Sequence, residues 1–162
     1  MRRLAAATVG VAFALGVGTL PGFAASTSPG KNSAFESGTI SPLGSGFPTL
    51  LTATIAKGKK KKVLAIEASL ASGSGALGVL ELSVEVNGVA VEGPIVNQSC
   101  AVSVQHCTVV GTWWLDVDAA EAASPGTFVK QPLVVTLQGG VQAGGDTDIQ
   151  GTATLSVRVE SK

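Results

Sequence analysis

Apolar and polar residues alternate in successive short runs through most of this sequence. The clearest run has Leu80, Leu82, Val84 and Val86 separated by glutamate and serine. Neighbouring side chains of a β-strand point to opposite faces, so each run predicts a strand with one buried and one wet face. Strands are predicted at 49–56, 63–70, 80–86, 89–96, 108–117, 133–137 and 152–160.

Two hairpins are expected between these runs. Asn87-Gly88 is typical of a two-residue type I′ turn, with 89–96 as the returning strand. The lysine-rich segment 57–62 is expected to turn 49–56 into 63–70. Three candidate binding residues for an anionic polysaccharide, cell-surface polymer or lipid headgroup are Lys59, Lys60 and Lys61. The simpler interpretation, which we favour, is a solubilising turn that blocks edge-to-edge aggregation.

One-sided alternation predicts an all-β fold, an antiparallel two-layer β-sandwich. A jelly-roll-like topology is the first choice. An immunoglobulin-like topology is the second, because the two cysteines are too close in sequence for a bridge between sheets. Residues 49–162 are expected to form this single domain, and the Ser-, Gly- and Pro-rich segment 25–48 a loop or an edge strand.

The segment from Cys100 to Asp118 contains both cysteines, the single histidine and both tryptophans. Alternation places Trp113 in the core and Trp114 on the opposite face. Trp114 is then partly covered by neighbouring chain, which we favour because tryptophan is usually well buried, or it is exposed to a ligand.

Cys100 and Cys107 enclose six residues and are expected to form a disulfide in an oxidising compartment. Metal ligation and thiol catalysis are the alternatives. A closed zinc site takes four ligands, but this chain offers two cysteines and one histidine. A base such as His106, directly beside Cys107, would point away from it in a strand.

The first 24 residues have the features of a secretory signal peptide. Arg2 and Arg3 precede a charge-free apolar run, and small residues lead up to Ala24. Localisation is therefore predicted to be secreted and extracellular, with the periplasm or cell surface as alternatives. No transmembrane segment is expected after cleavage, and the exposed sheet faces would allow a homo-oligomer.

Acidic residues suggest a calcium site. Asp116, Asp118 and Glu121 end the tryptophan run, and Asp146 and Asp148 lie in a glycine-rich stretch. Ca²⁺ takes six to eight oxygen ligands, so two loops that met could bind it. We favour the simpler interpretation, a short helix over 118–126 capped by Asp118 plus a polar turn. The cofactor expectation is accordingly none, with calcium as the alternative.

Composition and motifs argue against an enzyme. Acidic and basic residues balance, so no field attracts nucleic acid. No serine-hydrolase, zinc-peptidase or phosphate-binding motif is present. Three functions remain: a non-catalytic binding or surface-structural module, a carbohydrate-binding module using Trp114 with or without calcium, and a small hydrolase with an unrecognised site.

Overall fold

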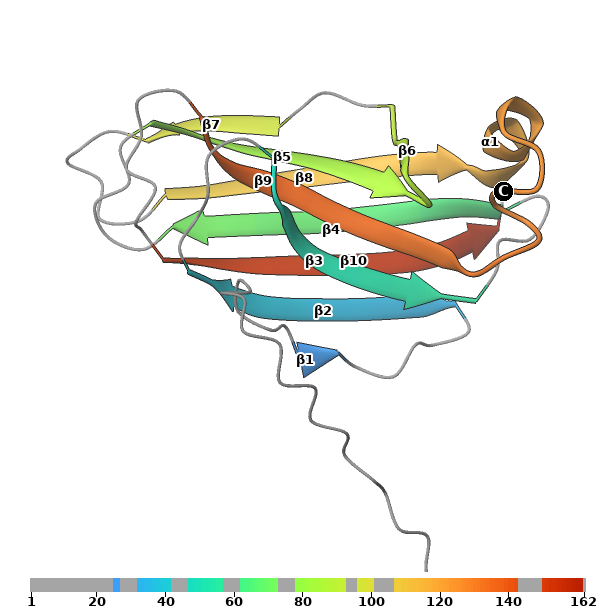
Figure 1. The fold of residues 1–162 in the computed structure, drawn as a ribbon, viewed down its shortest axis with the longest axis horizontal. Coiled ribbons are helices and arrows are strands. Elements are labelled where there is room, and N and C mark those ends of the chain that lie inside the picture. The colour runs from blue at the N-terminus through green and yellow to red at the C-terminus, as the bar shows by residue number, and fades with distance from the viewer. Residues whose placement is uncertain are drawn as a thin grey trace, which may run out of the picture.

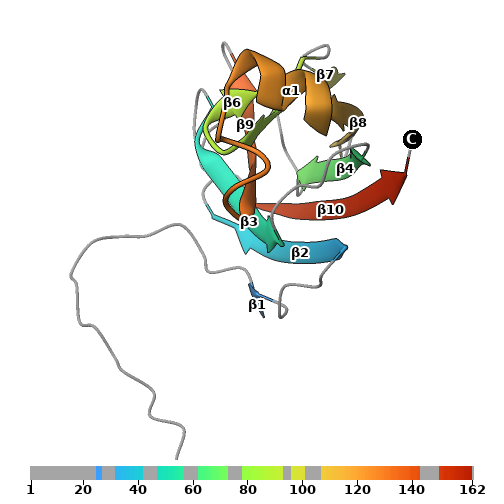
Figure 2. The same ribbon diagram turned by 90° about the vertical axis from the view of Figure 1, so that its right-hand side faces the viewer.

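A computed structural model of the chain shows two antiparallel sheets packed face to face (Figures 1 and 2). The predicted all-β antiparallel sandwich is thereby confirmed. The structure describes residues 25–26, 32–41, 47–56, 62–72, 78–92, 96–100, 107–142 and 150–161. The predicted signal peptide lies outside these residues. No helix among them is long and apolar enough to cross a membrane.

Each sheet has five strands in the described residues. Sheet 1 contains, in spatial order, β1 (Ala25–Ser26), β2 (Ser33–Ile40), β10 (Gly151–Ser161), β4 (Lys62–Ser72) and β8 (Cys107–Asp116). Sheet 2 contains, in spatial order, β3 (Thr49–Ile55), β9 (Leu133–Gln142), β5 (Gly78–Val86) and β6 (Val89–Ala90), and β7 (Val96–Cys100) also pairs with β5. β2 lies in the segment expected as a loop or an edge strand.

The long strands alternate between the sheets along the chain. β3 pairs with β9, whereas β4 pairs with β10 and β8. The predicted hairpin between 49–56 and 63–70 is therefore wrong, although both strands exist. Each run carries one apolar face, and such a face identifies a strand without identifying its neighbour. The choice between jelly-roll-like and immunoglobulin-like topology stays a prediction.

The Asn87-Gly88 turn forms as expected, with positive φ angles of 52° and 76°. Asn87 also fixes the turn in space. Its side-chain amide donates to the carbonyl of Thr127 at 2.7 Å, and its Oδ1 accepts from the N–H of Val134 at 2.7 Å. These bonds hold the tip of the hairpin against the chain that precedes β9.

The returning strand is not the continuous run 89–96 that we predicted. β6 pairs with the last two residues of β5, and β7 pairs with its first five. Continuing the β6 register would place residue 93 opposite Leu82, but Val96 lies there. The chain therefore gains three residues between the two segments, in the stretch that contains Pro94.

The core lies between the sheets and consists mainly of leucine, valine, isoleucine and alanine. Two aromatic residues join it, Trp113 from β8 and Phe128 from the loop before β9. The indole of Trp113 packs against Gly111, two residues earlier on the same face of β8. A β-carbon at Gly111 would lie 2.6 Å from Cζ3 and 2.9 Å from Cζ2 of this ring. Glycine therefore provides the space that the indole occupies.

The short helix α1 (Val117–Ala123) follows β8 directly and lies over one end of the sandwich (Figure 2). The expected helix is present, but its N-cap is Asp116 and not Asp118. β9 also continues to Gln142, five residues beyond the strand predicted over 133–137. A β-carbon at Gly139 would lie 2.8 Å from Cδ2 of Leu82 and would clash with the backbone of Glu81, which explains how this glycine fits inside the sheet.

Candidate functional site

The outer face of sheet 1 carries the most exposed aromatic side chain of the described core strands. Along β8 the inward residues are buried and the outward residues are exposed, as the alternation predicts. Trp113 is 3% exposed and Trp114 is 57% exposed. More than half of Trp114 is therefore accessible, and the rest of its surface is covered. Val110, two outward positions earlier, is 63% exposed.

Strand register defines the surroundings of Trp114. Trp114 lies opposite Ala65 of β4, and Ala65 lies opposite Arg158 of β10. Ala65 is on the outer face but only 2% exposed, because larger side chains flank it on both neighbouring strands. Because β8 is the last strand of sheet 1, the indole lies at the edge of this face.

Polar side chains occupy the middle of this face and bond to one another. Arg158 forms a 2.9 Å ion pair with Glu67, and both side chains are about half exposed. Ser69 and Thr154 share a 2.7 Å hydrogen bond between their hydroxyls. Such a surface ion pair contributes at most about 1 kcal/mol to stability. Its consequence here is that the two charges offset each other on this face.

Phe35 lies on the far side of these polar residues. It is on β2, opposite Ser156 of β10, and is 50% exposed. The register places Trp114 and Phe35 three strand spacings apart, which corresponds to about 14 Å across the sheet. We define the sheet-1 platform as the outward residues that span this distance, namely Val110, Thr112, Trp114, Ala65, Glu67, Ser69, Thr154, Ser156, Arg158 and Phe35.

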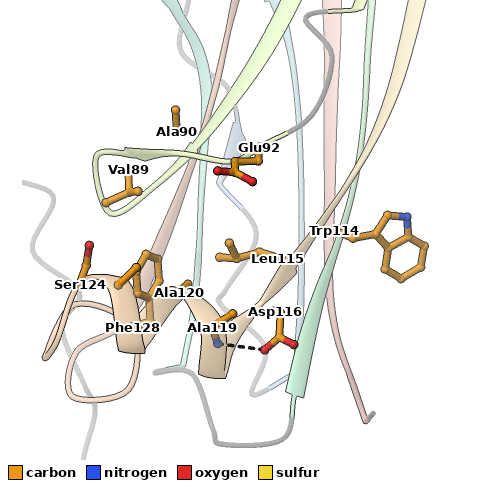
Figure 3. Close-up of a pocket in the computed structure, with 11 residues that line it drawn as sticks. Val89, Ala90, Glu92, Trp114, Leu115, Asp116, Ala119, Ala120, Ser124 and Phe128 are labelled. Atoms are coloured by element: carbon orange, nitrogen blue, oxygen red, sulfur yellow. Dashed lines mark hydrogen bonds between the residues drawn. The ribbon is translucent and has the colours of Figure 1, made fainter.

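A separate cavity of about 350 Å³ lies at the α1 end of the sandwich (Figure 3). Its walls come from the tip of the β5–β6 hairpin, the end of β8, α1 and Phe128. The walls are largely valine, alanine, leucine and phenylalanine. Figure 3 shows the indole of Trp114 pointing away from Ala119, Ala120 and Phe128. Trp114 therefore belongs to both regions, because it contributes to the cavity wall at the end of β8 while its indole points away from α1.

Carboxylates around the cavity have structural partners. Asp116 Oδ1 accepts the backbone N–H groups of Asp118, at 2.9 Å, and Ala119, at 3.1 Å, and so caps α1. Glu92 also lines the cavity. Two acidic groups in a cavity would suit a hydrolase, but a carboxylate that caps a helix is held by its backbone bonds. We therefore assign no catalytic role to this pair.

Glu121 organises the loop that follows α1. Its Oε1 accepts the N–H of Gly126 at 2.6 Å, and its Oε2 accepts those of Phe128 at 2.8 Å and Val129 at 3.1 Å. These bonds lower the pKa of the Glu121 carboxyl, and the bond from Phe128 contributes most. The positive charge of Lys130 lowers this pKa further. The carboxylate thereby positions Phe128, which is buried in the core.

The remaining predicted site residues fall in two groups. Lys59, Lys60, Lys61, Asp146 and Asp148 lie outside the described residues. Asp116, Asp118 and Glu121 lie in or beside α1, and the described part of the chain contains no cluster of three acidic, histidine or cysteine side chains that could hold a metal. A calcium site that includes Asp146 and Asp148 stays a prediction.

The predicted disulfide is also only partly described. Cys107 is buried at the start of β8, and the described residues include no free cysteine. β7 ends at Cys100, and β7 and β8 are in contact across the sandwich edge. The side chain of Cys100 lies outside the described residues, so the Cys100–Cys107 bond stays a prediction.

Comparisons with known proteins give little further information. No family model matches the sequence, and no curated protein matches it. One similar solved structure is described as "EclA C-terminal domain; sugar-binding protein". It is 11% identical, with a TM-score of 0.37, and the alignment covers 93% of this chain and 83% of that one.

Proposed function

We propose that this protein is an exported, non-catalytic β-sandwich module that binds a saccharide on the sheet-1 platform. The observation that carries the proposal is the 57% exposure of Trp114 on a strand face whose other exposed residues are the smaller Thr108, Val110 and Thr112. A tryptophan indole offers a rigid apolar plane with a polar N–H at one edge, which suits a ligand with an apolar ring face and hydroxyl edges. A sugar ring has both.

The charges of the platform favour a neutral ligand. Glu67 and Arg158 are paired with each other, so the centre of the face presents no net charge to a polyanion. Paired carboxylate and guanidinium groups still have lone pairs and N–H groups that can bond to hydroxyls. Neutral polysaccharide therefore suits the platform better than an anionic cell-surface polymer.

The extent of the platform favours an oligosaccharide over a single sugar. Trp114 and Phe35 are about 14 Å apart across the sheet by strand spacing. A ligand that contacts both must cross Ala65 and Glu67 of β4 and Ser156 and Arg158 of β10, and so must pass over the ion pair. Binding affinity is therefore expected to rise with chain length until both aromatic residues are covered.

A glycan array followed by titration of the intrinsic tryptophan fluorescence tests this proposal. Trp114→Ala should weaken binding by roughly 30-fold, the equivalent of about 2 kcal/mol for a central aromatic contact. Trp114→Phe should retain part of the affinity because it retains a ring. Val134→Ala is the matched control, since Val134 is an exposed apolar residue on the other sheet. Equal affinity of the wild type and Trp114→Ala, or no glycan bound at all, would refute the proposal.

A further inference from the structure

β8 is the longest regular edge strand that the structure describes. Its only described neighbour in sheet 1 is β4, which pairs with it over ten residues, and β7 of sheet 2 contacts it across the sandwich edge. The remaining described edges are shorter or irregular: β1 and β6 have two residues each, β7 has five, β3 has seven with a register shift at its start, and β2 has eight, two of which pair with β1. Proteins usually protect such an edge with charge, proline or a bulge.

β8 has none of these protections between Thr108 and Leu115. This stretch contains no charged residue and no proline. Its pairing with β4 is regular throughout, without a bulge. Its outward side includes the two strongly exposed apolar residues Val110 and Trp114. A second strand could therefore add to this edge with main-chain hydrogen bonds and apolar side-chain contacts.

The sequence of β8 is complementary to itself in one antiparallel register. If Thr112 lies opposite Thr112 of a second copy, Trp114 of each copy lies opposite Val110 of the other. Aromatic and β-branched residues are a favourable cross-strand pair. Asp116 then lies opposite Thr108, so no like charges meet. A two-fold axis at Thr112 generates both Trp114–Val110 pairs at once.

Neighbouring registers lose this match. With the axis at Gly111, Trp114 lies opposite Thr108 and Val110 opposite Thr112. With the axis at Trp113, Val110 lies opposite Asp116. Both registers place each exposed apolar side chain opposite a polar one. The Thr112 register is therefore the favoured one on side-chain grounds.

We infer that two copies of this protein form a symmetric dimer through antiparallel pairing of their β8 strands, centred on Thr112. The dimer joins the two copies of sheet 1 into one continuous sheet and places both Trp114 indoles on the same face. The four-residue offset separates the two indoles by about 14 Å along the strands. The inference does not depend on a saccharide ligand.

A charge exchange at the symmetry axis tests the dimer, with sedimentation equilibrium of the purified protein as the measurement. Thr112 is exposed, so Thr112→Lys and Thr112→Glu leave the core unchanged. Each variant places like charges opposite each other and should be monomeric where the wild type is a dimer. An equimolar mixture of the two variants places opposite charges together and should restore the dimer.

Thr108→Lys is the matched control, since it adds the same charge to an exposed position of the same strand face. In the inferred register it lies opposite Asp116 of the second copy, so the dimer should be retained or strengthened. Thermal unfolding of every variant checks that the fold is intact. A monomeric wild type throughout the micromolar range overturns the inference. Equal weakening by Thr108→Lys and Thr112→Lys, or an unrestored mixture, overturns it too.

Discussion

The contact between Gly111 and Trp113 predicts that Gly111→Ala destabilises the sandwich. An added β-carbon would lie within 3 Å of Cζ2 and Cζ3 of the indole and would clash with Cη2. Carbon atoms in favourable contact are about 3.5–4.0 Å apart, so the ring must move by about 1 Å or more. Trp113 is 3% exposed between two sheets, so no open space receives the displaced ring.

The expected cost follows from two opposing effects. Overpacking of a core by one methyl group costs about 1–3 kcal/mol, and this contact belongs at the upper end. Replacing glycine by alanine in a strand interior returns about 0.5–1 kcal/mol through reduced chain entropy. We therefore expect the free energy of unfolding to fall by about 2 kcal/mol. For a domain of this size the melting temperature should fall by roughly 6–10 °C.

Chemical denaturation of four proteins measures this effect: the wild type, Gly111→Ala, Trp113→Phe and the double variant. Phenylalanine is smaller than tryptophan, so the double variant should be more stable than the two single effects predict. The coupling free energy should be about 1 kcal/mol or more, as for residues in direct contact. A Gly111→Ala protein as stable as the wild type, or additive effects in the double variant, would show that the indole does not rest on Gly111.

Three further predictions concern the α1 end and the cysteines. Glu121→Gln should lower stability at neutral pH. Because the folded-state pKa of Glu121 is depressed, the stability of the wild type should fall as pH drops below the ordinary value of 4.5, and that of the variant should fall less. Thermal melts across pH measure both. Asp116→Ala should lower the free energy of unfolding by about 1 kcal/mol through loss of the helix cap. Ca²⁺ should produce neither heat nor a melting shift in the wild type, because Asp116 and Glu121 already accept backbone N–H groups. A calorimetric signal would contradict this. Reduction of the Cys100–Cys107 disulfide should add two hydrogens by intact mass and cost about 2–3 kcal/mol of stability; two thiols in protein kept oxidised would contradict the bond.

Local features of the fold could be predicted from the sequence because they depend on neighbouring residues. The opposite orientation of Trp113 and Trp114 follows from the two-residue period of a strand. The turn at Asn87-Gly88 follows from the tolerance of these residues for positive φ angles. Both features are fixed by adjacent positions alone, and the structure has both.

Features that depend on distant residues could not be predicted in the same way. The exposure of Trp114 depends on what neighbouring chain covers β8, and its partner Ala65 lies on β4. The ion pair between Glu67 and Arg158 joins residues 91 positions apart, so no local pattern indicates it. The role of Glu121 in holding Phe128 arises from the path of the loop, whereas the sequence showed only an acidic residue near a candidate metal site.

The position of β10 sets an order on folding. It lies between β2 and β4 in sheet 1, although it is the latest described strand in the chain. Until β10 is available, β2 has no partner towards β4, and sheet 1 stays divided. Long-range pairing of this kind slows folding, because a large loop must close before its contacts stabilise it. A nascent chain therefore stays without its central strand until translation has passed residue 161.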